Sequence, residues 1–72
     1  MELDSKFEKL IKGEVQYKSA NLGCNLLISR LQRKYDQDSS QEVLNSCIQE
    51  LKTFFEKYKV ISAKDLEEIA KL

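Results

Sequence analysis

Apolar residues recur every three or four positions along most of the chain, which is the spacing of an amphipathic helix. The first such stretch predicts a helix over residues 4–12, with Asp4 as its N-cap and Gly13 just past its end. The apolar face of this helix consists of Leu3, Phe7, Leu10 and Ile11. The next segment, EVQYK, alternates between polar and apolar residues, so residues 13–18 are left open as either extended or helical.

The second predicted helix, residues 19–35, is apolar on more than one side. Leu22 and Leu26 form a row on one side, because they lie four residues apart. Its main stripe lies elsewhere and consists of Ala20, Cys24, Leu27, Ile28, Leu31 and Tyr35. A helix of this kind is typical of the centre of a bundle, or of a position between a core and a partner.

Two further helices are predicted over residues 40–58 and 63–71. Ser39 and Glu42 form a capping box at the start of the first, and Ser62 and Asp65 form a similar box at the start of the second. Ile61 and Leu66 make a hydrophobic staple there. The core-facing stripe of the 40–58 helix is Val43, Leu44, Cys47, Ile48, Leu51, Phe54, Phe55 and Tyr58, and that of the last helix is Leu66, Ile69, Ala70 and Leu72.

Together these segments predict an all-α fold: one small, compact bundle of three to four helices over residues 1–72. A chain of 72 residues buries only about 60% of the surface that its unfolded form exposes. Cys24 and Cys47 lie on apolar stripes, so we expect two free, buried thiols and no disulfide framework. Since histidine is absent, the common zinc sites are excluded, and we expect no metal or cofactor. A partner subunit is then the natural source of further burial.

The stretch SANLGCN at the start of the second helix has two interpretations. If it is helical, Ser19, Ala20, Gly23 and Cys24 form one low patch where another helix approaches closely. Alternatively, Tyr17, Asn21 and Asn25, also four residues apart, form a polar row that binds a ligand through amide and phenol groups. We favour the packing interpretation, because small residues are often buried.

Several classes of function are disfavoured by the residues present. Without histidine there is no ordinary acid–base partner for serine or cysteine, so we expect no catalytic residues and no enzyme. Twelve basic and twelve acidic residues give a net charge of zero, which argues against nucleic-acid binding. The cations Arg30, Arg33 and Lys34 complement the dipole of a helix end. No apolar run is long enough to cross a membrane, and we expect a cytoplasmic protein.

Two short segments resemble known families. ELKTFFEKY is similar to the second helix of the helical-hairpin aspartyl-phosphate phosphatases of sporulating bacteria, which carry the motif SxxLDxLIxxY. Aligned on Leu51 and Tyr58, the serine and aspartate of that motif fall on Ile48 and Lys52, so the activity is not carried over. The order of LLISRL, an amphipathic helix and a short capped helix resembles small four-helix bacteriocin immunity proteins, which implies a protein or membrane-bound target.

The surplus of apolar positions predicts association between chains. A bundle of short helices covers one stripe per helix, and the second rows would remain as an exposed patch. The candidate interface consists of Leu22, Gly23, Leu26, Val43 and Phe55. We therefore expect a small non-enzymatic protein that acts through protein–protein interaction, as a homodimer. The alternative is a helical inhibitor or immunity-like protein that binds a different protein or a membrane-bound target.

Overall fold

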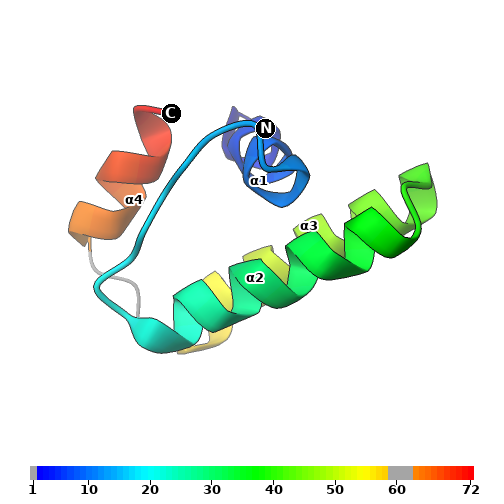
Figure 1. Ribbon diagram of the computed structural model, residues 1–72. Helices are drawn as coiled ribbons and strands as arrows, with labels where there is room; N and C mark the ends of the chain where they lie inside the picture. Colours follow the sequence, from blue (N-terminus) through cyan, green and yellow to red (C-terminus); the bar gives the residue numbers. More distant parts are fainter. Residues whose placement is uncertain (1, 59–62) are drawn as a thin grey trace.

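The computed structural model describes the chain at residues 2–58 and 63–72, and its side chains at residues 4–57 and 67–72. Within these ranges the chain forms four helices and no strand: α1 (Glu2–Lys12), α2 (Leu22–Gln37), α3 (Gln41–Tyr58) and α4 (Ala63–Ala70). α2 and α3 form an antiparallel hairpin, α1 packs across both, and α4 packs against α1 (Figure 1). The predicted all-α bundle is therefore confirmed.

The first helix ends as the sequence predicts and begins earlier. Gly13 has a φ of 73°, and the N–H groups of Gly13 and Glu14 donate to the carbonyls of Leu10 and Lys9, at 3.1 and 2.9 Å. This is a Schellman motif, which needs a residue with positive φ just past the helix. Asp4 is not the N-cap, because α1 already begins at Glu2. The Asp4 carboxylate instead lies 3.4 Å from the Lys52 ammonium of α3.

The second helix begins three residues later than expected. Asn21 is its N-cap: the Asn21 Oδ1 accepts a hydrogen bond from the Cys24 N–H at 3.2 Å. Because asparagine competes for the backbone in this way, Ser19 and Ala20 lie before the helix, and Ala20 is exposed rather than part of the core stripe. Residues 13–21 form a non-helical link that joins α1 to α2, which settles the question left open for residues 13–18.

The third helix has a different cap from the predicted one. Ser40 Oγ accepts from the Val43 N–H at 3.2 Å, so Ser40 is the N-cap of α3. The Ser39 hydroxyl donates to the Tyr35 carbonyl at 3.0 Å, so the predicted box of Ser39 and Glu42 is wrong by one residue. The predicted cap of α4 rests on Ser62 and Asp65, and the predicted staple on Ile61 and Leu66. The side chains of all four lie outside the described residues.

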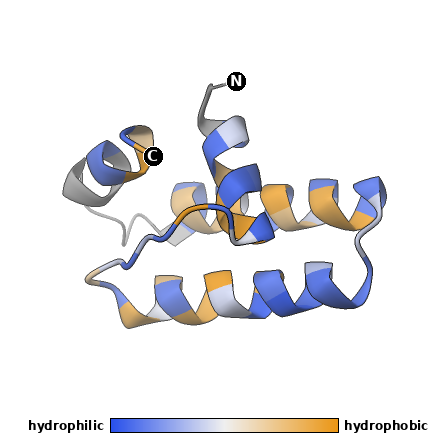
Figure 2. Cartoon of the chain, turned by 45° about the horizontal axis from the view of Figure 1, so that its top comes forward, coloured by the Kyte–Doolittle hydropathy of each residue, from blue (hydrophilic) through white to orange (hydrophobic). Residues whose placement is uncertain are grey.

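All four helices contribute to one core. Phe7 of α1 packs edge-on against Phe55 of α3, with ring centroids 5.0 Å apart. The buried apolar residues are Phe7, Leu10, Ile11, Cys24, Ile28, Leu31, Leu44, Cys47, Leu51 and Ile69. Orange and blue residues alternate along α2 and α3 (Figure 2), as expected of helices that carry apolar stripes. The predicted stripes are largely confirmed within the described side chains, with three corrections: Ala20 and Ala70 are exposed, and Phe54 is only half-buried. The side chains of Leu3, Tyr58 and Leu66 lie outside the described residues.

Candidate functional site

Two large apolar side chains of α2 point into solvent. Leu22 is 74% exposed and Leu26 is 71% exposed, and these are the exposed large hydrophobic residues among the described part of the chain. They lie one turn apart, so they form one row on the surface of the helix. The expectation that this second row lies outside the core of the single chain is confirmed.

A shallow groove of about 590 Å³ runs beside this row, between α2 and α3. Its apolar lining consists of Leu27 and Phe54, both half-buried, and all of its lining residues come from these two helices. Arg30 lines the groove and follows Leu26 by one turn, so the leucine row continues along the edge of the groove. We call Leu22, Leu26, Leu27 and Phe54 the leucine face.

The charged residues of the groove pair across the hairpin. Glu50 of α3 lies 3.2 Å from Arg30 and 3.4 Å from Lys34, measured between the charged atoms. All three side chains are more than a third exposed, so these ion pairs contribute little to stability. The basic residues at the end of α2 thus meet a carboxylate of the neighbouring helix.

The other predicted interface residues lie elsewhere. Val43 and Phe55 are half-buried and pack against the chain's own core, so they are not part of the exposed row. Gly23 is exposed, and a Cβ added to it would meet only the Asn21 side chain, at 3.1 Å, among the described residues. Ser19 and Ala20 precede α2, so Ser19, Ala20, Gly23 and Cys24 do not form one helical patch, and no other helix in the described part of the chain lies within 4 Å of a Cβ built on Gly23.

The predicted polar row is also dispersed. Tyr17 lies in the link, Asn21 caps α2, and Asn25 lies within α2, so the three do not share a helical face. The Asn25 side chain is occupied by the link: its Oδ1 accepts from the Ser19 N–H at 2.8 Å, and its Nδ2 donates to the Ser19 carbonyl at 2.9 Å. Tyr17 and Asn25 both line a hollow between the link and α2.

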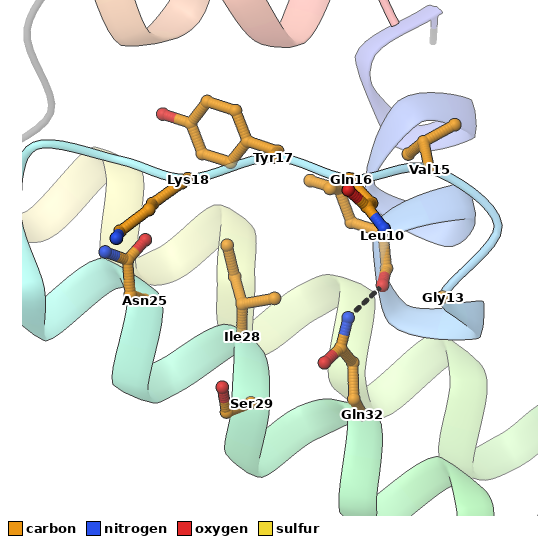
Figure 3. Close-up of a pocket in the computed structure, with 10 residues that line it drawn as sticks. All are labelled: Leu10, Gly13, Val15, Gln16, Tyr17, Lys18, Asn25, Ile28, Ser29 and Gln32. Atoms are coloured by element: carbon orange, nitrogen blue, oxygen red, sulfur yellow. Dashed lines mark hydrogen bonds between the residues drawn. The ribbon is translucent and has the colours of Figure 1, made fainter.

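A hollow of about 600 Å³ lies between the link and α2 (Figure 3). Its apolar lining residues are Leu10, Val15, Tyr17 and Ile28, and Gln16, Lys18 and Ser29 bring polar groups to it. Sequence reasoning missed this hollow, because it left the conformation of residues 13–18 open. The signal available was the Gly13 stop followed by Asn21, a strong helix cap, which together allow a non-helical link of this length.

Cys24 and Cys47 are both buried, as expected, and neither forms a disulfide. The Cys47 Sγ lies 3.8 Å from the Leu31 carbonyl oxygen, to which the thiol donates. Burial raises the pKa of the Cys47 thiol, although nearby Lys34 acts in the opposite direction. A raised pKa disfavours the thiolate, which is the nucleophilic and metal-binding form. In the described part of the chain, no three acidic or cysteine side chains come together as metal ligands.

Comparison with known proteins gives the chain no relatives: no family model, no curated protein and no solved structure matches it. Among the described residues, none of the helices is both long enough and apolar enough to span a bilayer. The candidate sites of this chain are therefore the leucine face and the hollow beneath the link.

Proposed function

We propose that this protein is a non-enzymatic interaction module that self-associates through the leucine face. The observation that carries the proposal is the exposure of Leu22 and Leu26 on one side of α2. Isolated exposed leucines are common, but two on adjacent turns beside an apolar groove form a patch that association would cover. Neither cysteine forms a disulfide, which suits a reducing compartment, and we propose the cytoplasm as the setting.

A second copy of the chain is the occupant that we favour. The α2–α3 hairpin presents two antiparallel helices on one side, and a two-fold axis would pair two hairpins into a four-helix arrangement. Such an interface is isologous, which means that both copies use the same surface. Leu26 of one copy would therefore lie near the two-fold axis, against the leucine face of the other copy. A net charge of zero removes long-range repulsion between the copies.

The magnitudes indicate a weak dimer. Burying one leucine side chain contributes about 1.5–3 kcal/mol, so four leucines contribute roughly 6–12 kcal/mol. Association opposes this with about 4–15 kcal/mol of lost translational and rotational freedom. Burial of Leu22 and Leu26 in both copies therefore barely offsets the free-energy cost of association. Leu27 and Phe54 in the groove have to contribute as well. We expect a dimer that forms at micromolar or higher concentrations.

Sedimentation equilibrium over a wide concentration range tests the proposal. The parent chain should shift from its 8.4 kDa monomer toward twice that mass as concentration rises. Leu26→Glu should leave the chain monomeric with unchanged helicity, because a carboxylate cannot be buried against leucine without a partner. Asn45→Glu is the matched control: it adds the same charge at an exposed position of α3 that lies outside the groove. It should leave the dimer intact.

A clean monomer at all concentrations would overturn self-association. The same result would favour the alternative, in which the leucine face of a helical inhibitor or immunity-like protein binds a different protein. If Leu26→Glu and Asn45→Glu weakened the dimer equally, a general charge effect would explain the result, and the leucine face would not be the interface.

A further inference from the structure

The hollow beneath the link is held open at both ends. At one end the Schellman motif fixes Gly13 and Glu14 against the last turn of α1. At the other end Ser19 is held to Asn25 of α2 by two hydrogen bonds. Between them Gln32 Nε2 donates to the Leu10 carbonyl at 2.9 Å, which ties α2 to α1 along the hollow (Figure 3). A cavity with walls tied in this way is preformed, so a ligand would not have to order them.

The lining of the hollow mixes apolar and polar side chains. Half-buried Val15 and Tyr17 supply accessible apolar lining, together with Ile28, which is 6% exposed. Gln16 and Lys18 of the link extend toward α2, where Ser29 lies on the facing helix (Figure 3). Lys18 carries the single charge among the lining residues. The electrostatic character of the hollow is therefore that of one cation beside an apolar surface.

We propose that this hollow binds a small organic monoanion: a carboxylate on a short apolar body. Lys18 would pair with the carboxylate, and the Ser29 hydroxyl would donate to it. Val15, Tyr17 and Ile28 would contact the apolar body, and the volume of about 600 Å³ falls within the usual range for small-molecule sites. This inference is independent of self-association, because no residue of the leucine face lines the hollow.

Octanoate is a suitable probe, and amide chemical shifts locate its binding. Titration of the ¹⁵N-labelled chain with sodium octanoate should give saturable shifts at residues 15–18 and around Ile28 and Ser29. Octan-1-ol has the same apolar body without the charge, and it should bind about three- to tenfold more weakly. Inorganic phosphate has a charge without the apolar body, and it should not saturate these sites.

The decisive variant is Lys18→Met, which keeps an unbranched side chain of similar length and removes the charge. It should weaken octanoate binding about three- to tenfold and leave octan-1-ol binding unchanged. Lys71→Met, at an exposed position that does not line the hollow, is the matched control and should bind octanoate as the parent does.

Three results would overturn this inference: equal affinities for octanoate and octan-1-ol, an unchanged affinity in Lys18→Met, or shifts centred on Leu22 and Leu26. The last of these would assign the probe to the leucine face instead. Because Leu26→Glu alters only that face, its octanoate affinity should equal that of the parent. Failure of the proposed dimer would leave this expectation unchanged.

Discussion

Asn25 holds Ser19 by both ends of its side-chain amide. The Ser19 N–H donates to Asn25 Oδ1 at 2.8 Å, and Asn25 Nδ2 donates to the Ser19 carbonyl at 2.9 Å. Ser19 is only 4% exposed, so water does not readily replace either bond. One side chain of α2 thus supplies the hydrogen bonds that the link lacks in secondary structure of its own, and it fixes where the link meets the helix.

Replacing the half-buried Asn25 should therefore lower the free energy of unfolding more than is usual for a polar residue of that exposure. In Asn25→Ala the buried N–H and carbonyl of Ser19 lose their partners, and each unsatisfied group costs about 1–3 kcal/mol. We expect the free energy of unfolding to fall by roughly 2–4 kcal/mol, measured by urea denaturation. Asn45→Ala is the control, since Asn45 is exposed and accepts a bond only from exposed Gln41, and it should lose under about 0.5 kcal/mol. Equal losses in Asn25→Ala and Asn45→Ala would show that the hydrogen bonds to Ser19 add no more stability than the exposed bond of Asn45 does.

Gly13 provides a test of the turn at the other end of the link. Its φ of 73° is unfavourable for residues with a Cβ, while no atom lies within 4 Å of where a Cβ would be. Gly13→Ala should therefore lose about 1–2 kcal/mol of unfolding free energy through backbone strain alone. Gly13→Asn should lose less, because asparagine tolerates this conformation better. If Gly13→Asn lost more than Gly13→Ala, crowding by the larger side chain rather than φ would be the cause.

The helices were predictable because each has a long, regular apolar stripe. Cys47 and Leu51 of α3 keep the helical spacing throughout, and the structure buries both. The exposure of Leu22 and Leu26 was predictable for the same reason: their row lies on a different side of α2 from Cys24. Periodicity identifies faces well, because it depends on geometry that holds along a whole helix.

Helix starts and the link were less predictable, because they depend on competition between single side chains. Asn21 could sit inside a helix or cap one, and its own backbone hydrogen bonding decides the outcome. Ser39 and Ser40 are chemically identical candidates for the cap of α3, and only the path of the preceding turn selects Ser40. The hollow depends on where α2 begins, since it exists only if residues 13–21 are not helical.

The two phenylalanines Phe7 and Phe54 should differ in their contributions to stability. Phe7 is fully buried, whereas Phe54 lines the groove and is half-buried. Phe7→Ala should lose about 3–5 kcal/mol, and Phe54→Ala should lose clearly less, because part of its ring already contacts water. Urea denaturation midpoints give the ranking. Should Phe7→Ala fail to fold, Phe7→Leu and Phe54→Leu offer a milder pair, and a larger loss at Phe54 would contradict the packing described for α3.

The buried thiol of Cys47 makes stability depend on pH in the alkaline range. Burial raises the pKa of this thiol in the folded chain above its ordinary value of 9.0. Below that value both folded and unfolded chains hold the proton, so the full stability is present. As pH rises further the unfolded chain releases its proton first, and the free energy of unfolding falls with a slope of at most about 1.4 kcal/mol per pH unit.

Cys47→Ser isolates this effect, because the serine hydroxyl does not ionise in this range. Between pH 7 and pH 10, urea denaturation should show that the parent loses more stability than Cys47→Ser does. All other residues are identical in the two proteins, so the difference between the two curves reports the thiol alone. Parallel curves would mean that the folded chain ionises Cys47 as easily as the unfolded one, which would contradict its burial between α2 and α3.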